Sequence, residues 1–246
     1  MITLKKNITC DKIAIVDGRV GKEIEDFFVN NNIEVIKIKN ILGARPETAC
    51  HPDIFFHVLS NKRLVCAPQV ANLRNVYDIL TARGFEIIYG KSVIEGNYSS
   101  EVAYNVARIG KVAFHNLKYT DPILRRELEN EGVELIHVNQ GYTKCSVSIV
   151  DENSIITADK GIARMATIAG IDTLLIEPNQ GIYINGKNQG FIGGATGKLN
   201  NTWLISGELS NLKDFKIIQK FLNSKNVEVV SISKGQVVDI GTIFIL

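Results

Sequence analysis

The stretch VAYNVARIGKVAFHNLKYTDPILRRELENEGVELIHV, residues 102–138, places two strand-like segments, a helix and a third strand-like segment one after another. Gly110 separates the first two segments, at 102–108 and 111–115. Asp121 and Pro122 are typical of a helix start, and Gly132 is typical of the residue after a helix end. The apolar segment VELIHV then follows. The stretch therefore predicts a strand–strand–helix–strand unit, abbreviated ββαβ.

The same order of elements recurs along the chain. Apolar segments and turn residues predict strand pairs at 53–59 and 62–66, at 145–159 around a turn at 151–153, and at 189–209 around an Asn-Asn turn. Helices are expected to start near residues 21, 70, 121, 161 and 211. The N-terminal unit (12–17, 21–30 and 33–38) lacks its first strand, and an orphan strand at 237–246 ends the chain. Pairing the orphan strand with the segment at 12–17 completes that unit.

We therefore predict an α/β fold that is a five-bladed α/β propeller, a ring of five ββαβ units closed by pairing of the N- and C-terminal strands. Closure leaves no exposed sheet edge. No Pro-, Gly- or Ser-rich linker interrupts the chain, so the prediction is one domain over residues 1–246. A doubly wound α/β sheet is the alternative. It needs single strands that alternate with helices, whereas nearly every expected helix here follows a strand pair.

The composition narrows the possible partners. Of the 246 residues 45% are hydrophobic, enough for a large core, and the net charge is +2 from 28 basic and 26 acidic residues. A nucleic-acid-binding protein needs a basic excess or a basic stripe, so we expect no nucleic-acid partner. No apolar run approaches the roughly 20 residues of a membrane span, so we expect no membrane partner. Nothing in the sequence indicates an oligomeric state.

The first residues and the cysteines indicate a cellular location. The start, MITLKKNITCDKIAIV, lacks the apolar segment and cleavage site of a signal peptide. The four cysteines (Cys10, Cys50, Cys66 and Cys145) show no CxxC spacing, which argues against a zinc ribbon and against a disulfide scaffold. We therefore expect a cytoplasmic protein with free thiols.

The common motifs of cofactor sites are missing. The segment GGATGKL, residues 193–199, lacks the first glycine of a phosphate loop and has Leu199 where a Ser or Thr is required. No GxGxxG, GxSxG or HExxH motif occurs, and the four histidines lack the spacing of zinc ligands on a helix. We expect neither a metal nor an organic cofactor.

Two short segments carry residue types suited to catalysis. In HPDIFF, residues 51–56, His51 and Asp53 lie two apart at the start of a predicted strand, so they project to the same side and can act as an acid/base pair. In QGYTKCSV, residues 140–147, Cys145 follows a glycine-containing loop and opens a predicted strand. Partial exposure, backbone N–H groups and Lys144 would favour its thiolate. The alternatives are a histidine that caps a turn and a buried structural cysteine.

Together these features resemble the pentein superfamily of guanidino-group-modifying enzymes, which includes arginine deiminases, dimethylarginine dimethylaminohydrolases, amidinotransferases and a non-catalytic ribosome anti-association factor. Five ββαβ units in a ring is the fold of that superfamily. HPDIFF resembles its H-x-D-x-x-F segment, which carries a catalytic His and a substrate-binding Asp. QGYTKCSV resembles its G-x-x-x-C-S/T segment, which carries the nucleophile. The resemblance implies such roles for His51, Asp53 and Cys145, and makes Asn105 a possible substrate ligand.

The order of units and some residues depart from the familiar enzymes. Their cysteine unit is C-terminal, whereas here a further unit follows it, as in a circular permutation. FIGG, residues 191–194, matches a segment with acidic substrate ligands but has Gly193 and Gly194 there. GQVVDIGT, residues 235–242, matches the acid-Gly-Gly-Asp-Val segment, with Asp239 on the Asp and Gln236 on the acidic residue that completes the triad. Asp53 and Asp239 are then the remaining candidates to hold a planar cation.

The resemblance implies a cysteine-dependent hydrolase or transferase that acts on a guanidine, amidine or related C–N bond of a small-molecule substrate. Cys145 would attack the trigonal carbon, and His51 would protonate the leaving amine and then activate water. Asp53 and Asp239 would orient His51 or the substrate cation. Gln236 and Asn105 are the further candidates for substrate binding.

Two other interpretations remain open. One is a non-catalytic pentein that binds a small molecule or a protein, which the glycines at 193–194 and Gln236 favour. The other is a plain α/β protein with coincidental motifs, in which Cys145 and His51 lie far apart. An enzyme needs these two residues at one central pocket.

Overall fold

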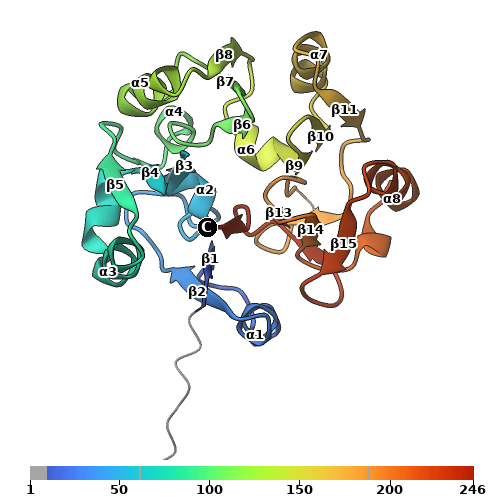
Figure 1. The fold of residues 1–246 in the computed structure, drawn as a ribbon, viewed down its shortest axis with the longest axis horizontal. Coiled ribbons are helices and arrows are strands. Elements are labelled where there is room, and N and C mark those ends of the chain that lie inside the picture. Colours follow the sequence, from blue (N-terminus) through green and yellow to red (C-terminus); the bar gives the residue numbers. More distant parts are fainter. Residues whose placement is uncertain (1–9, 61, 188) are drawn as a thin grey trace, which may run out of the picture.

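The computed structural model describes residues 10–60, 62–187 and 189–246. Five three-stranded sheets are arranged around the point where the C-terminus lies, with helices on the outside (Figure 1). In every one of these sheets the middle strand pairs antiparallel with one neighbour and parallel with the other. The residues 1–9, on which part of the expected cytoplasmic location rests, lie outside the described residues.

The strand bounds follow for each sheet in the order antiparallel neighbour, middle strand, parallel neighbour. They are β17 (Phe244–Ile245), β1 (Lys12–Asp17) and β2 (Ile33–Ile38); β3 (Phe56–Val58), β4 (Arg63–Cys66) and β5 (Glu86–Tyr89); β6 (Ala107–Ile109), β7 (Val112–His115) and β8 (Glu134–His137); β9 (Val147–Asp151), β10 (Ser154–Thr157) and β11 (Asp172–Leu175); and β13 (Thr196–Leu199), β14 (Thr202–Ile205) and β15 (Glu228–Ser231). Two short strands, β12 (Ile182–Tyr183) and β16 (Val237–Val238), pair parallel with each other.

One helix of nine or ten residues connects the two parallel strands of each sheet. These helices are α1 (Lys22–Asn30), α3 (Arg74–Ala82), α5 (Pro122–Asn130), α7 (Lys160–Ile168) and α8 (Phe215–Ser224). Their apolar faces pack on the sheets: α1 buries Ile24 and Phe28, and α8 buries Ile218 and Leu222. Each such buried side chain contributes about 1.5–3 kcal/mol.

The predicted start of α5 is confirmed. Oδ1 of Asp121 accepts hydrogen bonds from the N–H groups of Ile123 and Leu124, Pro122 is the first helical residue, and Gly132 has a φ of +68° just after the helix. The predicted strands at 12–17 and 33–38 are also confirmed, with the same bounds.

The strand β1 joins the two ends of the described chain. It pairs with β17, and the N–H of Ile13 donates to the carbonyl of Leu246 at 3.0 Å while the N–H of Leu246 donates back at 2.8 Å. The expected single strand at 237–246 is wrong in its extent, because a turn through Gly241 and Thr242 splits it into β16 and β17. Among the described residues the strands pair into five three-stranded sheets, and an isolated bridge between Gly197 and Ile243 links the sheet of β13 to the segment before β17.

The larger corrections concern one-turn helices that precede the inner strands. The predicted strand at 53–59 begins as α2 (Pro52–Phe55), and the predicted strand at 145–151 begins inside α6 (Thr143–Ser146). The predicted strand at 102–108 is a turn after α4 (Tyr98–Glu101), followed by β6. Two 3-10 turns, η1 (Pro68–Asn72) and η2 (Leu209–Asn211), complete the described elements. One-turn helices are too short to leave a periodic apolar pattern, so the sequence could not show them.

The irregular segments before β17, β3, β6, β9 and β13 occupy the same place in their five units. They are residues 239–242, 51–55, 101–105, 143–146 and 191–194. The candidate site residues fall in these segments, with the exception of Gln236. Repetition of one unit therefore brings together side chains that lie up to about 190 residues apart in the chain.

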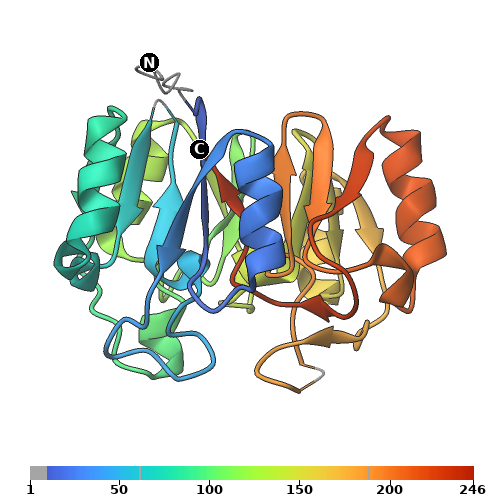
Figure 2. The same cartoon turned by 90° about the horizontal axis from the view of Figure 1, so that it is seen from below.

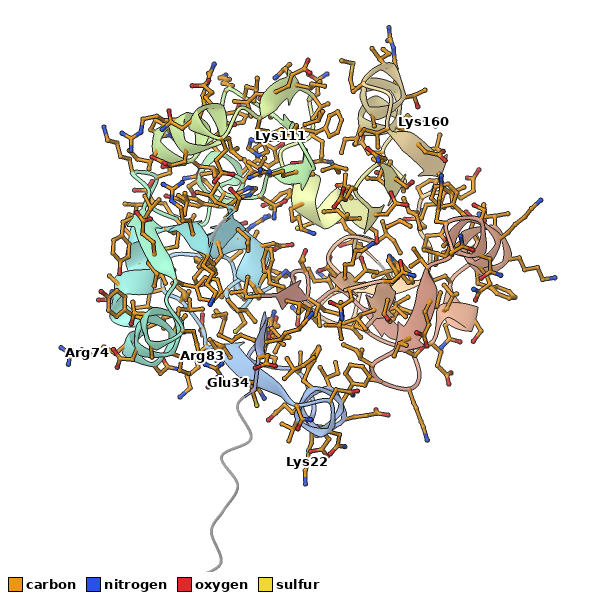
Figure 3. All side chains as sticks on the ribbon, in the orientation of Figure 1. Lys22, Glu34, Arg74, Arg83, Lys111 and Lys160 are labelled. Atoms are coloured by element: carbon orange, nitrogen blue, oxygen red, sulfur yellow. The ribbon has the colours of Figure 1, made fainter. Side chains whose placement is uncertain are left out.

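The surface is charged at its outer rim. Lys22, Arg74 and Lys160 project outward from α1, α3 and α7 on the periphery (Figure 3). The longest α-helix among the described residues, α8, has ten residues, and none is long and apolar enough to cross a bilayer.

Candidate active site

The thiol of Cys145 lies in a buried hydrogen-bonded group. Its Sγ atom is 3.1 Å from Oδ2 of Asp53 and 3.1 Å from Nδ2 of Asn105. Since the amide of Asn105 donates to sulfur, the thiol proton is free to point to the Asp53 carboxylate. Cys145 is 3% exposed, and Asp53 and Asn105 are 1% and 0% exposed. The structure therefore brings together three of the residues expected from the sequence.

Asn105 fixes the position of the cysteine through its whole amide group. Its Nδ2 also donates to the carbonyl of Asp53 at 3.0 Å, and its Oδ1 accepts the N–H groups of Lys144 and Cys145 at 2.9 and 3.2 Å. Both N–H donors and both acceptor positions of this amide are therefore used. Asn105 is thus a positioning residue for the α6 turn, and its side chain is not free to hold a ligand.

His51 lies between two carboxylates. Its Nε2 is 3.5 Å from Oδ2 of Asp17, and its Nδ1 is 3.8 Å from Oδ1 of Asp239. The residue is 1% exposed, and its Nε2 atom has no hydrogen-bond partner among the described residues. Burial lowers the pKa of His51, and the carboxylates of Asp239 and Asp17 partly oppose that effect. His51 is therefore neutral at pH 7, with two acidic neighbours that can stabilise it if it takes up a proton.

The turn before β17 supports both His51 and Asp53. Gly241 and Thr242 have φ values of +69° and +68°, which is unusual for a β-branched residue such as Thr242. A Cβ atom on Gly241 would lie 2.3 Å from Cβ of His51, so only glycine fits there. The strained Thr242 donates its hydroxyl to Oδ2 of Asp53 at 2.9 Å. The strained backbone at Thr242 thus places the hydroxyl that orients the carboxylate of Asp53.

Gly193 and Gly194 allow the segment before β13 to approach the site closely. A Cβ on Gly194 would lie 2.0 Å from Oδ1 of Asp239. A Cβ on Gly193 would lie 2.3–2.6 Å from the carbonyl oxygens of three residues at 144, 145 and 147. Asp239 itself accepts the N–H groups of Phe191 and Gly241 at 2.9 and 3.0 Å. In this chain the two glycines therefore serve close packing around Asp239.

A cavity of about 300 Å³ opens onto the reactive groups. Cys145, His51 and Asp239 line it together with Arg45, Thr48, Tyr142 and Phe191. Arg45 forms an ion pair with the buried Glu101 at 2.6 Å, and the hydroxyl of Tyr142 donates to the same carboxylate at 2.8 Å. Burial acts to raise the pKa of Glu101, but the hydrogen bonds from Arg45 and Tyr142 outweigh it, so the pKa is lowered. The charge of Arg45 is thus compensated at the wall of the cavity.

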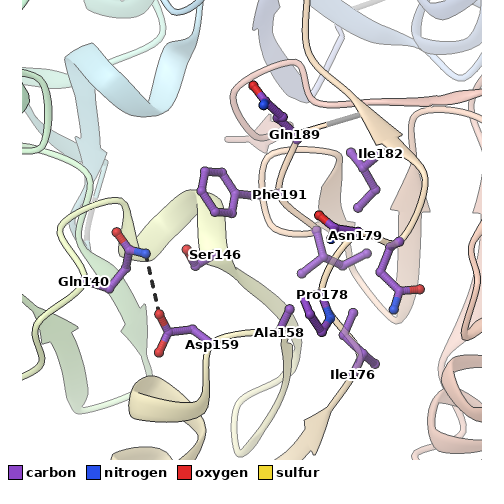
Figure 4. A pocket seen from close by; sticks show the side chains of 13 residues that line it. Gln140, Ser146, Ala158, Asp159, Ile176, Pro178, Asn179, Ile182, Gln189 and Phe191 are labelled. Atoms are coloured by element: carbon purple, nitrogen blue, oxygen red, sulfur yellow. Dashed lines mark hydrogen bonds between the residues drawn. The ribbon is translucent and has the colours of Figure 1, made fainter. Parts of the chain in front are cut away.

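A second cavity of about 210 Å³ flanks the first one, and Gln189 and Phe191 line both. Figure 4 shows Ser146, Gln140 and Asp159 on one side of this second cavity and the side chains of the 176–182 segment on the other. The hydroxyl oxygen of Ser146 is buried and has no hydrogen-bond partner among the described residues. Asp159 is the one charged residue among those that line it. The two cavities together offer room for a ligand longer than one planar cation.

The protonation of Cys145 differs from the expectation drawn from the sequence. Burial raises the pKa of the thiol well above its ordinary value, and the nearby carboxylates of Asp53 and Asp239 raise it further. Burial also raises the pKa values of Asp53 and Asp239. The expected partial exposure of Cys145 and the expected net preference for its thiolate are therefore wrong, although the charge of Lys144 still attracts a thiolate. The physical reason is that Cys145 sits in a helical turn behind the surface, next to two carboxylates.

The expected positions of His51, Asp53 and Gln236 also need correction. His51 and Asp53 were expected to project side by side from a strand, but α2 turns the chain between them, so Asp53 contacts Cys145 while His51 contacts Asp17 and Asp239. Gln236 is exposed and lines a different cavity, so the structure does not bring it to Cys145. Asp239 is the carboxylate that lies beside His51 instead.

Sequence reasoning missed Asp17, Arg45 and Phe191 as residues of the site. Asp17 ends the strand KIAIVD and could have been noticed as a buried acid that follows an apolar run. Arg45 and Phe191 lie in loops, where no periodic pattern indicates which side chains face inward.

These features define the class of protein: the chain has the fold of the pentein superfamily, and its buried cysteine lies beside the central segments of that fold. DDAH from Pseudomonas aeruginosa, in a mutant form complexed with citrulline, superposes with a TM-score of 0.56 at 8% identity, covering 89% of this chain and 90% of that one. An amidinotransferase from Microseira wollei in the saxitoxin biosynthetic pathway gives 0.59 at 12% identity, covering 89% and 87%. Agmatine deiminase from C. jejuni gives 0.52 at 13% identity, covering 90% and 75%.

Within that fold, the chain belongs to the family of unknown function DUF6873, whose model matches residues 15–244. No curated protein matches the sequence at a significant level. The solved structures establish the fold, and the function has to be argued from the site itself.

Proposed function

We propose that this protein is a cysteine-dependent hydrolase or transferase that acts on a guanidine, amidine or related C–N bond. One observation carries the proposal: the thiol of Cys145 is hydrogen-bonded to Asp53 at 3.1 Å and borders the same cavity as His51 and Asp239. A nucleophile, a titratable imidazole and carboxylates at one cavity are the groups that this chemistry requires.

The carboxylates suit a cationic substrate. Oδ1 of Asp53 is buried and has no hydrogen-bond partner among the described residues, and Asp239 borders the cavity. A positive charge bound in the cavity would pair with Asp239, would lie on the other side of Cys145 from Asp53, and would stabilise a thiolate. We therefore infer that the substrate's own charge favours ionisation of Cys145, whose raised pKa otherwise favours the neutral thiol.

The first half of the reaction would release an amine. In this proposal the thiol proton of Cys145 leaves its hydrogen bond with Asp53 and passes to His51 across the shared cavity, and Asp17 and Asp239 stabilise the imidazolium form. The thiolate forms an S–C bond with the trigonal carbon. The C–N bond to the leaving amine then breaks as His51 gives its proton to the amine nitrogen.

The second half would restore the cysteine. His51, now neutral, takes a proton from water, the water oxygen bonds to the carbon, and the S–C bond breaks; the proton on His51 then returns to the sulfur and regenerates the thiol of Cys145. In a transferase, an acceptor amine replaces the water. None of these steps needs a metal or an organic cofactor.

The flanking cavity bears on the rest of the substrate. Its polar groups are the free hydroxyl of Ser146 and the carboxylate of Asp159, and no basic residue is among those that line it. We propose that it takes the end of the substrate remote from the reacting carbon, and that this end carries hydrogen-bond donors rather than a carboxylate.

A non-catalytic binding protein is the second candidate, and two observations favour it. Cys145 is only 3% exposed, and Gly193 and Gly194 leave the site with fewer acidic side chains than the resemblance to the hydrolases implies. In that case the same cavity would bind a small cation without forming a bond to sulfur.

Covalent labelling distinguishes the two functions. Chloroacetamidine, a cationic guanidine mimic, is expected to alkylate Cys145 at least tenfold faster than the neutral chloroacetamide, with the site identified by mass spectrometry. Cys10 and Cys66 serve as internal controls, since the first is half-buried and the second is buried away from the cavity. Equal rates with both reagents, or an inert Cys145, would contradict the enzymatic proposal and favour the binding protein.

Turnover provides the second test. A screen of guanidino and amidino compounds for release of ammonia or an amine is expected to find a substrate whose turnover is lost in Cys145→Ser. Circular dichroism of the variant should match the unsubstituted chain. Turnover retained by a folded Cys145→Ser variant would exclude Cys145 as the nucleophile.

The finer description of the fold is part of the same proposal. We interpret the five sheets as the blades of a five-bladed propeller that forms one domain over residues 1–246. The β1–β17 pairing and the placement of the inner strands support this interpretation. The four free cysteines are compatible with the cytoplasmic location that we propose.

A further inference from the structure

A third cavity lies among the inner strands of all five sheets. It has a volume of about 230 Å³ and is lined by residues of β17, β3, β6, β9 and β13, together with Lys144 and Thr242. These strands lie on the inner sides of their sheets (Figure 1). The cavity shares no lining residue with the one that contains Cys145. It is thus a separate site in the middle of the molecule.

The two cavities are separated by one layer of residues. Cys145 lines the first cavity, and its neighbour Lys144 lines the third. Thr242 lines the third cavity and donates to Asp53 behind Cys145. In the side view the loops at 39–51 and 181–187, which border the first cavity, lie together on the lower face, and the C-terminus lies toward the upper one (Figure 2).

All of the charged residues that line the third cavity are basic. They are Arg108, Lys144 and Lys198, and the imidazole of His57 lies among them. No Asp or Glu lines this cavity within the described part of the chain. Since the whole protein has a net charge of only +2, this grouping does not follow from the composition. A small volume with one sign of charge concentrates counter-ions of the other sign.

The hydrogen-bonding state of these groups is incomplete. His57 is 5% exposed, and its Nε2 atom is buried without a hydrogen-bond partner among the described residues. The ammonium group of Lys144 lies over the ring of Phe244, 5.8 Å from its centroid, and forms no ion pair with any described carboxylate. A buried N–H group without a partner is costly, so His57 favours a bound acceptor. Lys144 is half-buried and burial lowers its pKa, so a bound anion would stabilise its ammonium form.

The other two basic residues are partly engaged. Arg108 forms an ion pair with Glu131 at 2.6 Å, and Lys198 donates to the carbonyl of Val150. Both still line the cavity and contribute positive charge to it. Burial lowers the pKa of His57 to about 3, and the charges of Arg108 and Lys144 add to that effect. Burial is the main reason that His57 stays neutral, and the charges of Arg108 and Lys144 oppose its protonation further.

We propose that this third cavity is a binding site for a small anion, an oxyanion such as phosphate or the carboxylate of a small metabolite. Nε2–H of His57 and the ammonium groups of Lys144 and Lys198 supply the donors, and Arg108 adds charge at the wall. Charge-assisted hydrogen bonds of this kind are the strong ones. The volume is several times that of one water molecule, which occupies about 30 Å³ in the liquid, so an oxyanion fits.

Calorimetry of the full chain tests the proposal. Inorganic phosphate and acetate are titrated in separate runs at constant ionic strength set with sodium chloride. Saturable binding of either at one site per chain is expected, and the comparison tells an oxyanion from a carboxylate. Lys144→Gln and Lys198→Gln should each weaken binding at least tenfold, because each removes one positive charge from the cavity.

Lys220→Gln is the matched control, since Lys220 is exposed on α8, away from the cavity, and it should bind within twofold of the unsubstituted chain. Phosphate should also shift the ring ¹⁵N resonances of His57 and leave those of the exposed His137 unchanged. Absence of saturable binding by either anion overturns the proposal, as does unchanged affinity in a folded Lys144→Gln. If Lys144→Gln does not fold, unchanged affinity in Lys198→Gln and an unshifted His57 resonance overturn it equally.

Discussion

Sγ of Cys145 and Oδ2 of Asp53 lie 3.1 Å apart, so the thiol donates a hydrogen bond to a buried carboxylate. The contact has two consequences. It fixes the direction of the thiol, and it places negative charge where a thiolate would form, which opposes ionisation. We expect a cysteine held in this way to react slowly until a positive charge enters the cavity, and to be protected by this from adventitious alkylation and oxidation.

The first prediction concerns the pH dependence of Cys145 alkylation. Because burial and the two carboxylates raise the pKa of the thiol, only a small thiolate fraction exists at pH 7. The rate with neutral chloroacetamide should therefore rise steadily with pH and have its midpoint above about 8.5, the ordinary value for cysteine. Stopped-time mass spectrometry between pH 6 and 10 measures it. A rate that is already level by pH 8 would show that the thiolate forms easily.

The second prediction concerns Asn105. Its amide makes four hydrogen bonds inside a fully buried site, so Asn105→Ala removes one bond each from the carbonyl of Asp53, the N–H groups of Lys144 and Cys145, and the thiol. We expect a loss of about 2–4 kcal/mol in the free energy of unfolding, measured by urea titration. Asn223→Ala, at an exposed position of α8, should change it by less than about 0.5 kcal/mol. Equal effects of the two substitutions would mean that the network contributes little.

The third prediction concerns Gly194. Gly194→Ala would place a Cβ 2.0 Å from the carboxylate of Asp239, so Asp239 must move away from His51. We expect a loss of roughly 1–3 kcal/mol in stability, together with loss of the preference of Cys145 for chloroacetamidine. The matched control is Gly21→Ala. Gly21 has ordinary φ of −71° and open space around it, so that variant should keep both properties.

The fourth prediction concerns stability in acid. The folded pKa values of His57 and His115 are lowered by burial to about 3 and about 4, against about 6.5 in the unfolded chain. A depressed folded pKa gives stability that is fully present above pH 6.5 and is lost as the pH falls, because only the unfolded chain takes up the protons. Between pH 6 and 4.5 the free energy of unfolding should fall by up to about 1.4 kcal/mol per pH unit for each histidine.

Variants isolate the contribution of one histidine. Urea titrations at several pH values in phosphate-free buffer measure how many more protons the unfolded chain binds than the folded one. His57→Gln should lower that number by about one. His137→Gln, at an exposed position, should leave the slope unchanged. The raised pKa values of Asp53 and Asp239 act in the opposite sense, since these groups stabilise the fold as they become protonated. An unchanged slope in His57→Gln would contradict the assignment.

Regular elements could be predicted from the sequence, and irregular ones could not. The strand bounds 12–17 and 33–38 and the capped start of α5 follow from apolar runs and from Asp121 and Pro122, which act locally. The turns that hold His51 and Cys145 are single helical turns, whose form depends on contacts with distant segments such as the one around Asn105. Patterns in the local sequence do not predict those contacts.

The site residues divide in the same way. Cys145, His51 and Asp53 lie in short motifs and could be named. The expected position of Gln236 was wrong. Gln236 precedes β16, whereas Asp239 follows β16, in the turn that carries its side chain inward. The role of Asn105 as a support for the α6 turn, and the presence of Asp17 and Arg45, depend on the arrangement of the five sheets and became visible only in three dimensions.

Lys144 and Cys145 are consecutive residues whose N–H groups share one acceptor, Oδ1 of Asn105, yet their side chains face different cavities. Thermodynamic linkage then works in both directions across a single peptide unit. An anion beside Lys144 would disfavour the thiolate, and the thiolate would by the same factor weaken the anion. A cation beside Asp239 would instead strengthen the binding of the anion. Occupancy of one cavity could therefore be measured as a change of affinity in the other.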